Sequence, residues 1–214
     1  MGAKTWMLVF SNGSPKAALA TKPTLDREAT IALVNKLFAP ERLVAMDDAD
    51  LCFTCPPDNE IIAGCFPGVV VLAAKEIGID FPSQLPAKFL EEFADGNLYL
   101  HAMHSVVDWL AFAVWRNGTI ERSLSLSPDS GIVEDIGARL AFEIPYWAGE
   151  HSAVDPGEDE SEYPFLFHPL ELGEAALVEF FGYQLEGDIA AATLEPDQIA
   201  LMRFKRKKSW WRFG

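Results

Sequence analysis

Cysteine and long apolar runs are scarce in this sequence, and each scarcity excludes a class of protein. The 214 residues include three cysteines, Cys52, Cys55 and Cys65, an odd set without the second pair that a zinc ribbon needs. A disulfide-rich secreted scaffold is therefore excluded, and we expect ordinary thiols in a reducing compartment. The longest apolar stretches, 69–74 and 109–115, fall far short of the roughly 20 residues that cross a bilayer, so we expect no membrane span.

The short patterns that identify common enzyme classes are missing as well. The sequence contains no G-x-S-x-G nucleophile elbow, no Walker loop, no dinucleotide-binding glycine pattern and no H-E-x-x-H. Residues 1–13 hold a five-residue apolar run but no longer apolar segment with a cleavage site of small residues. We therefore expect a cytoplasmic protein and assign it no cofactor.

Basic residues are few and unevenly placed. The chain has 17 Lys and Arg against 32 Asp and Glu, a formal net charge of −15. Six of the basic residues lie in the last twelve positions, which contain no acid, so we predict a basic aromatic tail over residues 205–214. An acidic surface repels phosphates, so we expect no extended nucleic-acid binding and favour a basic protein partner. The tail either contacts anionic lipid or single-stranded nucleic acid, or folds back on the acidic body.

Half of the residues are apolar, and their spacing predicts one domain of mixed secondary structure. Apolar residues recur at helical spacing over about 26–38 and 170–182. Two β-rich runs, 109–116 and 119–126, are joined by Asn117-Gly118, the strongest short-range signal for a two-residue hairpin. We predict a single α+β domain over residues 1–204, with a largely antiparallel sheet centred on the 109–126 hairpin and the two helices packed on it.

The predicted hairpin has a definite register. With a two-residue loop, Arg116 faces Thr119 and Trp115 faces Ile120. The same register gathers seven residues on one apolar face: Trp109, Ala111, Ala113, Trp115, Ile120, Leu124 and Leu126. The first strand is apolar on both sides, which predicts an interior position in the sheet. Ser105 and Asp108 also fit a capping box, which predicts instead a helix over 106–115, but the β-branched and aromatic content favours the strand. Residues 140–144 are a further strand candidate.

Polar residues converge at the open end of this hairpin. In the predicted register Asp108 faces Ser127, which brings His104 and Asp108 close to Asp129 and Ser130. A histidine with two carboxylates could act as general acid and base, or supply metal ligands, and this defines the alternative of a small hydrolase using His104, Asp108 and Asp129. The same Ser-Pro-Asp-Ser-Gly run is also ordinary turn chemistry.

His101 and His104 form an H-x-x-H spacing. On a helix the two rings would share a face and could chelate zinc, which makes them weak metal candidates. On a strand, residues three apart point to opposite sides, so our strand assignment argues against a metal. The alternative is one buried, hydrogen-bonded histidine and one exposed histidine.

A second candidate region precedes an acidic loop at residues 150–162. Tyr146 and Trp147 beside Glu150 and His151 would suit a ligand or partner pocket, because Tyr and Trp offer large, stiff contact areas. Trp147 could equally fill the edge of the core while the polar pair is solvated. Ser130 is a further ligand-binding candidate at the hairpin end.

Several segments taken together resemble an uncharacterised bacterial family, frequent in actinobacteria, that is catalogued only as a domain of unknown function. These segments are Met1-Gly-Ala-Lys-Thr-Trp-Met7, Gly64-Cys-Phe-Pro-Gly68, His101-Ala-Met-His-Ser-Val-Val-Asp-Trp109, Ser123-Leu-Ser-Leu-Ser-Pro-Asp-Ser-Gly131, Pro145-Tyr-Trp-Ala-Gly-Glu-His151 and His168-Pro-Leu-Glu-Leu-Gly-Glu-Ala175. The resemblance implies a stand-alone domain and no particular activity. The hairpin followed by Leu140-Ala-Phe-Glu143 is also similar to parts of bacterial immunity-type proteins.

Two functions of different classes follow from these observations. The first is a cytoplasmic binding or protein-interaction domain, immunity-like in kind, whose acidic surface neutralises a basic partner. It requires an exposed acidic or aromatic surface around residues 147–162. The second is the small hydrolase, which requires its candidate side chains within about 4 Å of one another at the floor of a pocket.

Overall fold

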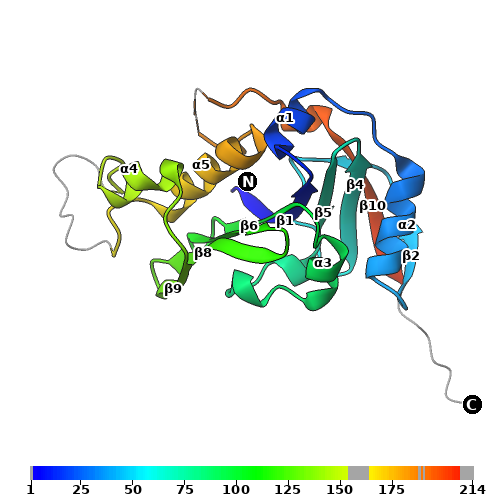
Figure 1. Ribbon diagram of the computed structural model, residues 1–214, viewed down its shortest axis with the longest axis horizontal. Helices are drawn as coiled ribbons and strands as arrows, with labels where there is room; N and C mark the ends of the chain where they lie inside the picture. Colours follow the sequence, from blue (N-terminus) through cyan, green and yellow to red (C-terminus); the bar gives the residue numbers. More distant parts are fainter. Residues whose placement is uncertain (1, 154–163, 188, 190, 208–214) are drawn as a thin grey trace, which may run out of the picture.

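The described strands form one ten-stranded sheet with helices on both faces (Figure 1). The structure is a computed structural model, and it describes residues 2–153, 164–187, 189 and 191–207. The strands are β1 (Lys4–Ser11), β2 (Arg42–Ala45), β3 (Ala49–Asp50), β4 (Glu60–Phe66), β5 (Val69–Ala73), β6 (Asn97–His104), β7 (Trp109–Arg116), β8 (Thr119–Ser127), β9 (Gly131–Ile136) and β10 (Ala200–Lys207). All strand pairings among the described residues are antiparallel, which confirms the α+β class and the antiparallel sheet.

The sheet is centred on β1 and not, as predicted, on the 109–126 hairpin. Its strand order is β2-β10-β4-β5-β1-β6-β7-β8-β9, with β3 paired to β10 outside this path. β1 lies between two hairpins because both of its faces are apolar: Met7 and Val9 are buried in one core and Leu8 in the other. The hairpin formed by β7 and β8 is displaced toward the β9 edge, although β7 is an interior strand as expected.

Five helices of the described residues cover the two faces of the sheet. They are α1 (Pro15–Ala20), α2 (Arg27–Leu37), α3 (Ala87–Glu92), α4 (Ile144–Trp147) and α5 (Pro169–Phe181). α1 and α5 bury their apolar residues in one core, and α2 and α3 bury theirs in the other (Figure 1). The carboxylate of Asp26 caps α2 by accepting from the Ala29 amide, and Gly182, at φ 86°, ends α5 in the left-handed conformation. None of these helices combines the length and the apolarity that a membrane crossing requires.

The predicted hairpin is confirmed, and the alternative helix over 106–115 is wrong. Asn117 and Gly118 adopt positive φ angles of 49° and 74°, as a type I′ turn demands, and Trp115 pairs with Ile120. Beyond this point Glu121 is an extra residue that forms a bulge, so that Val114 pairs with Arg122.

The bulge corrects the predicted face of β8. Phe112 pairs with Leu124, and Ala111 pairs with Ser125. Leu124 and Leu126 therefore lie on the side of Phe112, and not with Ala111, Ala113 and Trp115, because a one-residue slip moves every following side chain to the opposite face.

One further expectation, a strand near residue 140, fails. The predicted strand at 140–144 is instead a 3-10 turn, η3 (Ala141–Glu143), followed by α4, whose first turn contains Pro145. The expected boundary between body and tail at residue 204 falls inside β10, where Lys205 pairs with Val44 of β2. Residues 208–214 and most of the acidic loop, 154–163, lie outside the described residues.

Candidate functional site

A groove of about 410 Å³ opens on the face of the sheet that α5 covers. It lies at the start of β6 and the end of β7, opposite the end of that strand pair where the sequence predicted a site. Its lining residues are Gly13, Ser14, Pro15, Asn97, Tyr99, Arg116, Leu140, Ala141, Phe142, Glu179 and Phe180. These residues come from five separate parts of the chain, and sequence reasoning singled out none of them as a site residue.

The floor of the groove is aromatic. Tyr99 and Phe180 are 6% and 7% exposed, and their ring centroids lie 5.2 Å apart. The Phe142 ring, half-buried, meets Phe180 edge to face at 5.4 Å. The Arg116 guanidinium lies 4.9 Å from the centroid of the Tyr99 ring, so a cation already contacts this floor, whose rings suit apolar and cationic groups.

The polar groups at the rim differ in whether they are already paired. Arg116 donates from Nη1 to the Tyr99 hydroxyl at 2.6 Å, and its Nε lies 3.2 Å from Oε2 of Glu121. Asn97 donates from Nδ2 to the Gly13 carbonyl at 2.9 Å. Glu179 is exposed and makes no ion pair with any described residue. The rim therefore offers an unpaired carboxylate, while its arginine is neutralised.

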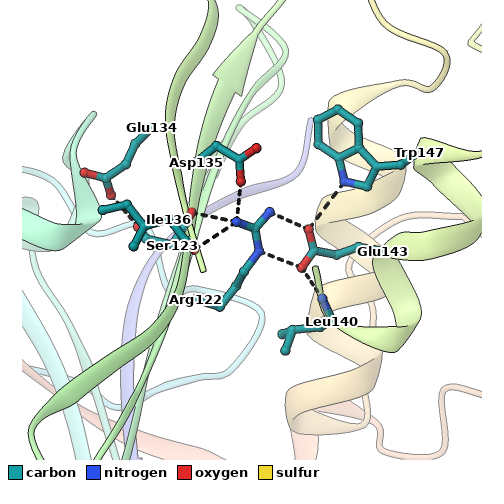
Figure 2. Close-up of polar contacts among 8 residues, drawn as sticks. All are labelled: Arg122, Ser123, Glu134, Asp135, Ile136, Leu140, Glu143 and Trp147. Carbon is teal, nitrogen blue, oxygen red and sulfur yellow. Dashed lines mark hydrogen bonds and ion pairs between the residues drawn. The ribbon is translucent and has the colours of Figure 1, made fainter. Parts of the chain in front are cut away.

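A buried arginine, Arg122, anchors the segment that forms one wall of the groove, and Figure 2 shows its polar contacts. Arg122 is fully buried. It donates two parallel hydrogen bonds to Glu143, from Nε to Oε1 at 2.9 Å and from Nη2 to Oε2 at 2.7 Å. Its Nη1 donates to the carbonyls of Ser123 at 3.1 Å and Ile136 at 3.0 Å, and to the Asp135 carboxylate. Burial disfavours the charge of Arg122, but the bonds to Glu143 and Asp135 outweigh burial and raise its pKa.

Glu143 connects Arg122 to the residues that line the groove. Its carboxylate also accepts from the Leu140 amide at 2.8 Å and from Nε1 of Trp147 at 3.4 Å (Figure 2). Leu140 to Glu143 are thereby held against β8, and Phe142 is held in the groove wall. Arg122 reaches Glu143 only because the bulge at Glu121 turns its side chain to this face.

The three candidate catalytic residues lie at the other end of the strand pair. His104 is half-buried in β6, stacks on Trp6 at 5.7 Å and accepts the Val106 amide at Nδ1. The Asp108 carboxylate lies 3.7 Å from Nε2 of His168, which caps α5, and Asp129 is exposed in the β8–β9 turn. Within the described ranges no hydrogen bond or ion pair joins His104, Asp108 and Asp129, and the hydrolase stays a prediction.

Ser130 and His101 have clear structural partners. The amide of Ser130 donates to Oγ of Ser127 at 3.2 Å, which is turn chemistry. His101 is fully buried between Thr5, at 2.7 Å from Nδ1, and the Gly173 carbonyl, at 3.0 Å from Nε2. Nε2 donates to that carbonyl, so Nδ1 accepts from the Thr5 hydroxyl, and burial lowers the pKa of His101 to about 4. Both ring nitrogens are engaged, and no metal-binding group of three His, Cys, Asp or Glu occurs in the described part of the chain.

The second candidate region surrounds α4, outside the groove. Tyr146 is buried and stacks on His151 at 4.1 Å, while Glu150 is exposed. Trp147 packs edge to face on Phe167 at 4.9 Å, and Arg139 lies over its ring at 4.1 Å. Tyr146 and Trp147 belong to α4, the helix that follows η3, and their contacts hold this helix in place. Neither residue lines the groove.

The three cysteines are free thiols. Burial is the main cause that raises the pKa values of Cys52 and Cys55 to about 11. Both side chains are therefore protonated near neutral pH.

Comparison with known proteins gives one finding. A family model described as a family of unknown function (DUF6928) matches residues 5–204. No curated protein and no solved structure was found to match the chain.

Proposed function

This chain belongs to the DUF6928 family, whose function is unknown, and from its groove we propose that it is a cytoplasmic binding protein that takes up a cationic side chain of a basic partner. One observation carries the proposal: Glu179, whose carboxylate has no ion-pair partner in the described residues, lines the same groove as the aromatic residues of its floor. An ammonium or guanidinium group can contact a carboxylate and an aromatic face together.

The charge of the other rim residues supports a cation over an anion. Arg116 is the basic residue of the lining, and Glu121 together with the Tyr99 hydroxyl occupies its guanidinium. An anionic ligand would have to displace these partners, whereas a cationic ligand meets Glu179 directly. The formal charge of −15 adds a long-range attraction for a basic partner.

Replacement of the Glu179 carboxylate tests the proposal. We expect E179Q to bind a fluorescein-labelled oligo-arginine peptide at least about fivefold more weakly than the unchanged protein, because the direct charge contact is lost. Fluorescence anisotropy at fixed ionic strength measures the affinity, and an oligo-glutamate peptide serves as the negative ligand.

The matched control is E171Q, which removes the same charge from an exposed position of α5 outside the groove. Both variants change the net charge equally, so a difference between them reports the groove and not the overall field. Equal affinities of E179Q and E171Q, or tighter binding of the oligo-glutamate peptide, would contradict the proposal.

A further inference from the structure

The β9 edge of the sheet is unpaired within the described residues. β9 is the last strand of the order and pairs on one side with β8. On its other side, no backbone hydrogen bond joins residues 131–136 to any described residue. Such an edge presents a row of N–H and C=O groups that an added strand can satisfy.

A bulge at Val133 and the buried carboxylate of Glu134 interrupt the regular pattern of this edge, but two apolar side chains on it remain exposed. Ile132 and Ile136 are 49% and 38% exposed, and the strand contains no lysine and no proline. The opposite edge of the sheet, β2, is four residues long and begins with Arg42, and a short charged strand is a poor template for pairing. The two edges are therefore not equivalent, and β9 is the one open to a partner.

The charge along β9 indicates what kind of strand would fit. Residues 129–136 include three acids and no base. Glu134 is bonded to the neutral Ser83 and Ser123, and Asp135 shares the single guanidinium of Arg122 with Glu143. Asp135 and Glu143 thus share one buried cation while Glu134 has neutral partners, which leaves an excess of negative charge beside the free edge.

We propose that β9 receives an extended segment of a basic partner protein, in which lysine or arginine alternates with apolar residues, as an eleventh strand of the sheet. The backbone of Gly131–Ile136 supplies the hydrogen bonds. Ile136 contacts the apolar side chains on the face of Ser123, and Asp135, on the opposite face with Ile132, attracts the basic ones. This surface extends the proposed function, because the same class of partner would be held outside the groove.

A second copy of this chain is a poorer occupant of the edge. Pairing β9 with β9 would bring together two chains that each carry a charge of −15. It would also place Glu134 and Asp135 of both copies in one short ribbon, where like charges are destabilising.

Hydrogen exchange with mass spectrometry tests the inference on the full chain. The probe is a short synthetic peptide in which lysine alternates with valine, and its control is the same peptide with alternate backbone nitrogens methylated. We expect the unmodified peptide to slow exchange of outward-facing amides in residues 131–136 by at least about tenfold, and the methylated peptide to leave them unchanged. I132K should lower the affinity for the unmodified peptide at least about tenfold, because a lysine on the strand repels the basic segment.

The matched control is I31K, which adds the same charge at a 41% exposed position of α2. Equal effects of I132K and I31K, peptide binding without protection of 131–136, or no binding would overturn the inference. Amides of 131–136 that are protected in the free protein, or a dimer seen by light scattering, would overturn it as well. Failure here is distinguishable from failure of the groove, because Ile132 does not line the groove and Glu179 is not on β9.

Discussion

At the scale of single residues, Arg122 is the side chain on which most of the local order depends. Its five hydrogen bonds reach four residues on β8, β9 and η3, so one guanidinium joins the sheet edge to the groove wall. A buried ion pair adds little net stability when compared with apolar residues of the same shape, but loss of one partner leaves a buried charge without compensation.

We therefore predict that R122M lowers the free energy of unfolding by about 3–5 kcal/mol. Glu143 and its two other donors, the Leu140 amide and Trp147, would remain around an uncompensated carboxylate. Urea denaturation followed by circular dichroism measures the change.

The double variant R122M/E143Q serves as the control. It removes the uncompensated charge of Glu143 and keeps a side-chain oxygen that accepts from the Leu140 amide. It should recover a substantial part of the loss. If the double variant is as unstable as R122M, or if R122M is as stable as the unchanged protein, the role assigned to the pair is wrong.

At the scale of elements, α5 connects the core to the groove and to the segment that follows it. The carbonyl of Gly173 accepts a hydrogen bond from Nε2 of His101 in β6. Phe180 and Glu179, further along the helix, line the groove. The buried carboxylate of Glu174 accepts the amides of Leu185 at 2.8 Å and Glu186 at 3.1 Å, which ties that segment to the helix.

Glu174 should make the stability of this tie depend on pH. Burial raises its pKa to about 7, against the two amide hydrogen bonds, so the folded chain holds this proton more tightly than the unfolded chain does. Its stabilising contribution is complete below the ordinary carboxyl pKa and is lost as pH rises through about 7. The stability of the unchanged protein relative to E174Q should therefore fall by on the order of 3 kcal/mol between about pH 5 and about pH 8.

Chemical denaturation at several pH values measures this difference. E171Q, an exposed neighbour on the same helix, should give a curve parallel to that of the unchanged protein. A curve for E174Q that is also parallel would rule out the proposed titration.

At the scale of the whole molecule, we expect net charge to govern the approach of the proposed basic partner. The charge of −15 creates an attraction that salt screens, with a Debye length of about 10 Å at 0.1 M and about 3 Å at 1 M. Contacts made after docking in the groove are screened less, because water is partly excluded there.

We expect the association rate of the oligo-arginine peptide to fall at least about tenfold when the salt concentration rises from about 0.1 M to about 1 M. The dissociation rate should change less. Stopped-flow anisotropy separates the two rates, and an association rate that does not respond to salt would show that the charge of the molecule does not steer the partner.

The elements were predictable where a local signal defines them. Asn117-Gly118 has one favoured turn, and Asp26 and Gly182 mark the ends of their helices, so the hairpin and both helices lie where the sequence predicted them. The segment 140–144 was mistaken for a strand because its short apolar run has no periodicity that separates a strand from a helical turn.

The groove was not predictable, because no segment of it carries a signal of its own. Tyr99, Phe142 and Phe180 read as core residues, and Glu179 reads as a solvated residue on a helix. A bulge leaves no mark in the alternation of polar and apolar residues. The sequence therefore could not predict that the Arg122 side chain points toward Glu143.

The sequence by itself determined that this protein is an acidic α+β domain with a type I′ hairpin, because charge, turn geometry and helix ends depend on neighbouring residues. Only the tertiary structure decided which faces meet and where a ligand could bind. One inserted residue at Glu121 reverses the face of β8, and the groove exists because residues from 13 to 180 are brought together over the start of β6 and the end of β7.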